Sequence, residues 1–264
     1  MHIPFGSYSS CDNSLPPLHC NKSPNMFLFY SDKVEGARTI FEQQEAVHIQ
    51  RVLRRKVGDI IHWTDGKGYL YSGPITAVSK REITASVQNK EHWKKTWTPD
   101  IHIAVCPTKN IQRMEWMVEK LCEIGVDTIS LVIAHNSERR NIKIPKLQRK
   151  VISACTQSLK TQFPVLNTPV SFEDYIKNFD ASQRGYIAHC REALPPLSKE
   201  KDAAKQKDVH ILIGPEGDFT AREVESALSM GWIPVGLGAA RLRTETAALA
   251  ACHTLHLLDQ LRGE

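Results

Sequence analysis

Apolar and polar residues alternate in short runs from residue 26 to about residue 98, and this period-two pattern predicts β-strands. The runs are MFLFY, DIIHWT, GYLYSGPITAV and EITASVQ, with Asp65-Gly66 and Ser79-Lys80 at the expected turns. Short strands joined by tight turns are typical of a small β-barrel, so we expect one in this part of the chain.

One helical segment, EQQEAVHIQRVLRRKVG, interrupts these strands. We expect Gly58 to end it. Its basic residues fall at positions i, i+3 and i+4 and should share one helical face. Two interpretations of that face stay open: a solvated surface, or a phosphate-contacting patch of an RNA-binding module. The expected apolar side consists of Val47, Ile49, Val52 and Leu53, and the basic face of Arg51, Arg54 and Arg55, with Lys56 beside it.

After the polar segment EHWKKTWTPD, which we interpret as a linker, the pattern changes to alternating strands and helices. The expected strands are IHIAVCP, TISLVIA, PVLN and GYIAHC, and the helices between them are NIQRMEWMVEKLCEIG, IPKLQRKVISACTQSLK and FEDYIKNF. This order predicts a parallel α/β sheet. We therefore expect domains over 26–98 and 99–264, with REALPPLSKEKDAAKQKD as a polar surface loop in the second.

The stretch HILIGPEGDFTAREVESALSMG predicts a strand, a glycine-containing loop and a well-defined helix start. Thr220 and Glu223 form a T-x-x-E capping box, and Phe219 and Val224 hold the positions of a hydrophobic staple. Gly231 supplies the stop.

A second loop, GLGAARLRT, follows the next apolar run in the same way. Because ligands of open α/β sheets bind outside the carboxyl ends of strands, we expect the two loops to be adjacent and to make one pocket. Their glycines, Gly214, Gly217, Gly236 and Gly238, let backbone groups approach a ligand, which suits an adenine edge or a ribose. Neither loop matches a phosphate cradle or a nucleophile elbow.

The composition limits the possible classes of protein but does not indicate a function. The 264 residues carry a formal net charge of +5, which fits a polyanionic partner such as RNA and is also ordinary for a soluble enzyme. Seven cysteines without a C-x-x-C pair argue against disulfide frameworks and zinc sites. Cys155 and Cys252 are expected in the core. His253 and His256 lack a third ligand candidate, so we expect no metal. Residues 1–25 have the composition of a disordered extension.

The segments IGPEGDFTAREVE and GLGAARLRTETAALAA closely resemble the paired signature of the RsmE family, the 16S ribosomal RNA uridine-N3 methyltransferases of the SPOUT superfamily. The resemblance covers nearly everything from Met26 onward, including VHIQRVLRRKVGD, RMEWMVEKLCEIGVDTI, SER at 137–139 and QS at 157–158. The chain departs from it in two places. Asp218 stands where the family often has a second glycine, and Lys160 stands where an arginine follows QSL.

This resemblance implies a homodimer that binds S-adenosylmethionine in a trefoil knot, with a PUA-like RNA-binding module at 26–98, a SPOUT methyltransferase domain at 99–264 and 16S rRNA as its partner. The scattered cysteines fit reduced thiols in a cytosol, so we expect a cytoplasmic location. The resemblance also implies cofactor contacts from Ile213, Gly214, Pro215, Glu216, Gly217, Leu237, Gly238, Leu242, Arg243, Thr244, Thr246 and Ala247. It implies RNA contacts from His48, Arg51, Arg54, Arg55, Lys56 and Arg139.

Methylation of N3 requires loss of its proton or stabilisation of the uridine anion, and a cation aimed at the base carbonyls would do the latter. We assign that role, or a grip on the target phosphate, to Arg243, and the alternative is an ion pair with Glu216 or Glu245. Glu216 is the second catalytic candidate, although it could instead orient backbone or bind ribose. Thr244 or Thr246 is expected to cap the final helix, which is apolar on more than one side and so suits burial against a partner chain as well as the core.

Two competing functions stay open at this point. The chain could be a non-catalytic RNA-binding dimer, which would have no affinity for the cofactor. It could also be an enzyme of the same fold that methylates another nucleotide, at a ribose 2′-hydroxyl or at guanine N1 of transfer RNA.

Overall fold

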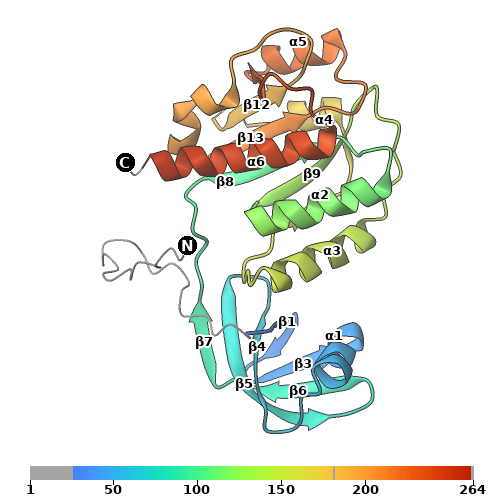
Figure 1. Ribbon diagram of the computed structural model, residues 1–264, viewed down its shortest axis with the longest axis vertical. Helices are drawn as coiled ribbons and strands as arrows, with labels where there is room; N and C mark the ends of the chain where they lie inside the picture. The colour runs from blue at the N-terminus through green and yellow to red at the C-terminus, as the bar shows by residue number, and fades with distance from the viewer. Residues whose placement is uncertain (1–25, 181, 263–264) are drawn as a thin grey trace, which may run out of the picture.

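The structure is a computed structural model that describes residues 26–180 and 182–262, so the expected extension at 1–25 lies outside the described residues. Two seven-stranded sheets follow one another along the chain. The first stands at the foot of the molecule, and the second carries helices on both of its faces (Figure 1).

The first sheet is curled around an aromatic core that includes Phe29, Phe41 and Trp63. Its order is β1-β4-β5-β6-β3-β2, and β7 also pairs with β5. The long strand β5 pairs with β4 and β7 in one half of the sheet and with β6 in the other. Its register shifts between Ile75 and Ala77, where a bulge bends the strand. The strands are β1 (Leu28–Tyr30), β2 (Lys33–Glu35), β3 (Arg38–Glu42), β4 (Ile60–Thr64), β5 (Tyr69–Val78), β6 (Glu82–Ser86) and β7 (Asn89–His92).

The helix of this unit is shorter than expected. It consists of α1 (Gln43–Val47) and a π-helical turn η1 (His48–Val52), and Arg54 then adopts a left-handed conformation with φ of 53°. Arg55 donates its backbone N–H to the oxygen of Ile49, which closes the helix end. The prediction that Arg51, Arg54 and Arg55 share a helical face is therefore wrong, because the helix stops before Arg54.

The second sheet is parallel throughout, with the order β10-β9-β8-β13-β12-β14 and with β11 also paired to β9. The predicted α/β class with a smaller N-terminal β unit is confirmed. The strands are β8 (Asp100–Val105), β9 (Thr128–Ile133), β10 (Val165–Leu166), β11 (Val170–Ser171), β12 (Arg184–Ala188), β13 (Asp208–Ile213) and β14 (Ile233–Val235).

Helices α2 (Ile111–Ile124), α3 (Ile144–Gln157) and α6 (Thr244–Leu261) cover one face of this sheet, and α4 (Phe172–Lys177) and α5 (Ala221–Ser229) cover the other (Figure 1). Two short 3-10 turns, η2 (Leu197–Lys199) and η3 (Lys201–Lys205), follow β12. Cys155 and Cys252 are buried in the core beneath α2, α3 and α6, as expected.

The order of the strands corrects one expectation about the loops. Strand β12 lies between β13 and β14, so the two glycine-containing loops do not leave neighbouring strands. Sequence order could not show this, because β14 returns to the outer edge of β12 instead of extending past β13. The expected pocket is therefore bordered by the ends of three strands, β12, β13 and β14, instead of two.

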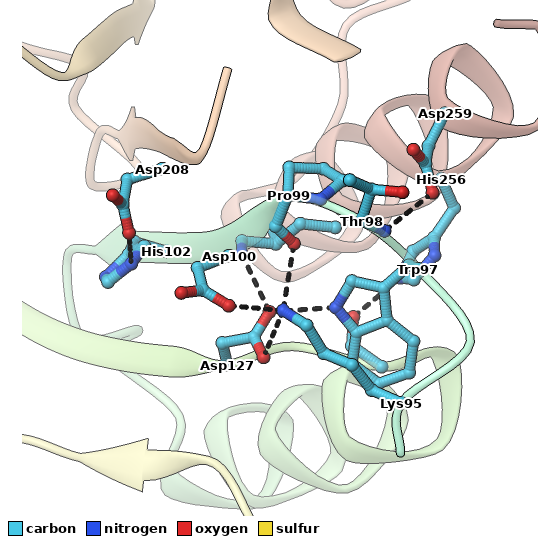
Figure 2. A network of polar contacts seen from close by, with 12 residues as sticks. Lys95, Trp97, Thr98, Pro99, Asp100, His102, Asp127, Asp208, His256 and Asp259 are labelled. Atoms are coloured by element: carbon cyan, nitrogen blue, oxygen red, sulfur yellow. Dashed lines mark hydrogen bonds and ion pairs between the residues drawn. The ribbon is translucent and has the colours of Figure 1, made fainter. Parts of the chain in front are cut away.

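Ion pairs and hydrogen bonds fix the segment between the two sheets in place. Lys95 pairs with Asp100 and, at 2.9 Å, with Asp127, whose other oxygen accepts a hydrogen bond from Trp97 Nε1 at 2.8 Å (Figure 2). The Thr98 backbone N–H donates to the Asp259 carboxylate near the end of α6. The expected linker is also shortened, because β7 runs to His92 and β8 begins at Asp100.

A second connection joins the two sheets through the segment that follows α3. The Thr161 backbone oxygen accepts hydrogen bonds from the Gly68 N–H at 2.9 Å and from Thr64 Oγ1 at 3.0 Å. Phe163 in turn donates its N–H to the oxygen of Gly66. These hydrogen bonds hold the first sheet against the segment that follows α3.

Candidate functional site

The loop after β13 and the start of α6 meet through one buried hydrogen bond. Thr244 Oγ1 donates to the backbone oxygen of Gly214 at 3.0 Å. The helix is capped by Arg243, whose side chain makes no capping hydrogen bond. The expected cap by Thr244 or Thr246 is therefore wrong: Thr244 is the first helical residue, and its hydroxyl is directed to the neighbouring loop.

The loop after β13 is fixed by the local features that its sequence predicts. Thr220 and Glu223 form both hydrogen bonds of the capping box, and Phe219 and Val224 are buried together. A Cβ at Gly214 would lie 3.1 Å from the Phe219 ring, so a side chain at that position would require the ring to move by a few tenths of an ångström.

Asp218 connects this loop to a neighbouring one. Its φ is 60°, a left-handed conformation that aspartate tolerates better than most residues. One carboxylate oxygen accepts from the Phe219 N–H at 2.8 Å and the other from the Cys190 N–H at 3.0 Å. Asn136, after β9, donates to the backbone oxygens of Gly217 and Asp218 at 3.1 and 2.9 Å.

The loop after β12 is the part of the site that the sequence interpretation missed. Residues 191–208 were expected to form a surface loop, but the backbone N–H of Gly236 donates to the oxygen of Pro195, and that of Leu197 donates to the oxygen of Gly236. Leu197 and Ala203 are buried. This loop therefore lies directly beside the loop after β14. The adjacent Pro195-Pro196 pair, which favours extended backbone, was the available signal.

Gly238 presents open backbone at the same edge of the sheet. Its φ is 112°, which L-residues with a Cβ rarely adopt, and a Cβ placed there would meet nothing within 4 Å. Leu237 and Leu242 on either side are half-buried. The loop thus offers backbone polar groups beside apolar side chains with free space in front of them.

A cleft of about 710 Å³ lies between the N-terminal ends of α2 and α6. Within it Glu245 approaches Arg113, with 3.7 Å between Oε1 and Nε. Arg243 is exposed, and in the part of the chain that the structure describes it pairs with neither Glu216 nor Glu245. The cleft is lined by Asn110, Gln112, Arg113, Trp116, Arg241, Leu242, Arg243, Glu245 and Thr246.

Two predicted site residues, Glu216 and Arg139, make hydrogen bonds with backbone groups of the loop before α2. Glu216 is exposed, and its Oε1 accepts a hydrogen bond from the Lys109 N–H at 2.9 Å, which links the loop after β13 to the loop before α2. The Arg139 guanidinium donates to the backbone oxygens of Thr108 and Lys109. The catalytic role of Glu216 and the RNA contact of Arg139 stay predictions.

The basic residues of the first sheet remain near the surface. His48, Arg51, Arg54 and Lys56 are exposed, whereas Arg55 is half-buried. Helix α1 and the N-terminal ends of α2 and α6 lie on the same side of the view in Figure 1.

Lys160, which departs from the family pattern, is directed to the junction between the sheets. Its ammonium lies 5.8 Å from the centre of the Trp97 ring, and burial lowers its pKa. The Lys160 side chain therefore lies against the linker and does not reach outward.

The two histidines of α6 have different surroundings. His253 is exposed, whereas His256 is buried with Nε2 2.6 Å from the Gly125 oxygen. Over residues 26–180 and 182–262, no three potential metal ligands gather, and no helix is long and apolar enough to span a membrane.

Comparison with known proteins gives two family matches along the chain. The family described as an RNA methyltransferase domain matches residues 95–256, and the family described as an RNA methyltransferase PUA domain matches residues 41–88.

Similar proteins cover nearly the whole chain. A crystal structure of a probable rRNA-methyltransferase from Porphyromonas gingivalis is 42% identical, covers 90% of this chain and 100% of its own, and has a TM-score of 0.82. The ribosomal RNA small subunit methyltransferase E of Neisseria gonorrhoeae, solved with bound S-adenosyl methionine, is 25% identical, covers 89% of this chain and 98% of its own, and has a TM-score of 0.79. The protein of that name from Buchnera aphidicola is 27% identical and covers 88% of this chain and 92% of its own.

Proposed function

Because this chain belongs to the RNA methyltransferase family, we propose that it methylates N3 of a uridine in the 16S RNA of the small ribosomal subunit, with S-adenosylmethionine as the methyl donor. The observation that carries the proposal is the junction of the loops after β12, β13 and β14 with the start of α6 in a chain of this family. Relatives at 42% and 25% identity share the fold, and the second is a small-subunit rRNA methyltransferase that binds this cofactor.

The residues at this junction fit an adenosine-containing cofactor. Gly238 leaves open space in front of exposed backbone, and Leu237 and Leu242 supply apolar surface for a purine ring. Backbone N–H and C=O groups can pair with the edge of an adenine and with ribose hydroxyls. When bound, the cofactor supplies an electrophilic methyl group on a sulfonium. The cofactor contacts predicted above belong to this proposal.

Arg243 is suited to stabilise the charge that develops on the base. It is exposed, lines the cleft beside the cofactor loops and is free of the alternative ion pairs. A guanidinium directed at the base carbonyls would stabilise the uridine anion as N3 loses its proton. Glu216, held to Lys109, would orient the loop rather than react.

The unit formed by residues 26–98 is proposed to bind the ribosomal RNA. The PUA match at 41–88 and the exposed basic residues Arg51, Arg54 and Lys56 support this assignment. The hydrogen bonds around Thr161 would hold this unit at a set position relative to the methyltransferase domain.

The trefoil knot, the homodimer and a cytoplasmic location complete the proposal. Two exposed apolar side chains on α6, Leu257 and Leu261, support a partner-covered surface.

The proposal is tested by mapping modified bases in small-subunit RNA from cells that lack the gene and from cells in which it is restored. We expect one uridine to lose its N3 methyl group on deletion and to regain it on restoration. An unchanged uridine pattern, with or without the loss of a methyl group elsewhere, would refute uridine N3 as the target.

A further inference from the structure

Glu245 is a buried carboxylate that leaves one oxygen without a partner. It is only 6% exposed. Its Oε1 faces Arg113 Nε at 3.7 Å, whereas Oε2 is buried and has no hydrogen-bond partner among the described residues. An unpaired buried acceptor costs about 1–3 kcal/mol, so proteins rarely keep one without a use.

The side chain of Glu245 belongs to the cleft between α2 and α6, where the cover over its buried Oε2 has to shift before a ligand can reach that oxygen. Glu245 lines this cleft together with Arg113, Trp116 and Arg243. It lies in the first turn of α6, where the partial positive charge of the helix stabilises a carboxylate. Trp116 is 45% exposed, so its ring is available to stack with a planar ligand.

This set of groups is complementary to the Watson–Crick edge of uracil. That edge presents one N–H donor, at N3, between two carbonyl acceptors. The cleft offers an acceptor, Glu245, together with two guanidinium donors, Arg113 and Arg243. Guanine N1 carries a proton as well, but its neighbour on one side is an amino group, which a guanidinium would repel. Cytosine N3 has no proton to donate. The cleft therefore favours uracil over both.

Resting on the proposed function, we infer that Glu245 is the catalytic residue that accepts the N3 proton of the target uridine, whose ring stacks on Trp116. N3 keeps the electron pair of the broken N–H bond and uses it to form the bond to the methyl group, whose former bonding electrons remain on the donor's sulfur. Glu245 afterwards releases the proton to water. No further reactant is needed.

The test compares Glu245→Gln with the parent and with Glu115→Gln, a control that removes a carboxylate on α2 paired with Lys146 outside the cleft. We expect Glu245→Gln to lower the single-turnover rate on small subunits from cells lacking the gene by roughly 10²–10⁴, the usual contribution of a general base. Affinities for cofactor and subunit should stay within about threefold. Glu115→Gln should keep the parental rate.

The pH profile separates a chemical role from a structural one. The residual rate of Glu245→Gln should rise in proportion to hydroxide, because solvent must then remove the N3 proton. A structural role would lower the rate by the same factor at every pH. Glu245→Asp, which keeps the carboxylate at shorter reach, should retain part of the rate and the parental profile. A uniform loss, or a loss of cofactor affinity that accounts for the slower rate, would overturn the inference.

A binding measurement without cofactor provides an independent readout. The parent should bind subunits from cells lacking the gene several-fold tighter than subunits from cells that carry it, because an N3 methyl group would meet Glu245. Glu245→Ala should reduce the difference in affinity between the two kinds of subunit. An unchanged difference would contradict the inference. If the parent forms no 3-methyluridine, the proposed function fails. If Glu245→Gln forms it at the parental rate, only the role of Glu245 fails.

Discussion

The Asp218 carboxylate accepts a hydrogen bond from the Cys190 backbone N–H at 3.0 Å, and this bond ties the loop after β13 to the loop after β12. Its other oxygen accepts from Phe219 N–H, so the two carboxylate oxygens serve two different loops. Asp218 stands where the family often has a glycine, and its side chain therefore links two loops that a glycine could not link in this way.

Asp218→Asn tests this connection. Asparagine tolerates the left-handed backbone, but its amide has only one oxygen and cannot accept both hydrogen bonds. We expect cofactor affinity to fall roughly fivefold, equivalent to a loss of about 1 kcal/mol, while the thermal midpoint changes little. Asp218→Gly should give the same loss of affinity. Calorimetry that finds parental affinity in both variants would show that the loop connection does not support the cofactor site.

Gly238 and Gly231 form a matched pair for locating the cofactor. Both have positive φ, 112° and 87°, and a Cβ at either would meet nothing within 4 Å. Substitution by alanine should therefore destabilise both variants by a similar amount, about 1 kcal/mol. Only Gly238→Ala should weaken cofactor binding, because Gly231 lies at the far end of α5. Equal binding by the two variants in calorimetry would move the cofactor away from the loop after β14.

How far the sequence predicts this site depends on whether a feature is local. The capping box of Thr220 and Glu223 spans four residues and was predicted correctly, as were the core positions of Cys155 and Cys252. The hydrogen bond between Thr244 and Gly214 spans 30 residues, and its donor was instead expected to cap a helix. Such a contact depends on where strands lie in the sheet, which local patterns do not determine.

The same limit explains the remaining errors. The position of β12 between β13 and β14 is a property of the whole sheet, and so is the contact between Pro195 and Gly236. The strands β2 and β7 are short and mostly exposed, so they carry little alternation to detect, whereas β3 does alternate buried and exposed residues over Arg38–Glu42 and was overlooked. The end of the basic helix at Arg54 required a left-handed arginine, which no helical pattern would indicate.

The basic surface of the first sheet can be tested through the salt dependence of RNA binding. Arg51→Ala combined with Arg54→Ala should weaken subunit binding and reduce the slope of log affinity against log salt by about one for each lost phosphate contact. The control is Lys80→Ala with Arg81→Ala, an exposed pair of cations in the turn between β5 and β6 of the same unit. Should both double variants retain the parental slope, the residues near Arg51 are only solvated.

His210 should make the stability of the methyltransferase domain sensitive to acid. It stacks on His102 at 4.1 Å and packs against Phe179, and Tyr175 Oη lies 3.2 Å from its Nδ1. Asp208 lies 3.6 Å from His102. Burial, and secondarily the charge of His102, lower the pKa of His210 from 6.5 to about 3. Between these values the unfolded chain binds a proton that the folded chain does not, so the free energy of unfolding falls as the pH falls.

His210→Phe keeps a ring but cannot titrate. Between about pH 7 and about pH 5, the parent should lose about 1–2 kcal/mol more of its unfolding free energy than this variant, as measured by urea titration. His253→Phe removes an exposed histidine on α6 and should lose as much as the parent. Identical losses in the parent and His210→Phe would exclude this histidine as the source of acid sensitivity.

Arg243→Ala separates chemistry from cofactor binding. Because the Arg243 side chain is exposed in the cleft and makes no ion pair with Glu216 or Glu245, its loss should leave folding and cofactor affinity within about threefold of the parent. The single-turnover rate should fall by roughly 10²–10³, as on loss of a preorganised electrostatic donor. Arg243→Lys should recover only part of that rate, since a point charge does not replace a planar fork.

The most direct measurement uses the purified chain, small subunits from cells lacking the gene, and S-adenosylmethionine that carries a deuterated methyl group. Mass spectrometry of the digested RNA should find the label in 3-methyluridine, at one position, with the parent, and at a strongly reduced rate with Arg243→Ala. Label in another nucleoside, or no label in the RNA at all, would contradict the assignment of this chain as a uridine-N3 methyltransferase.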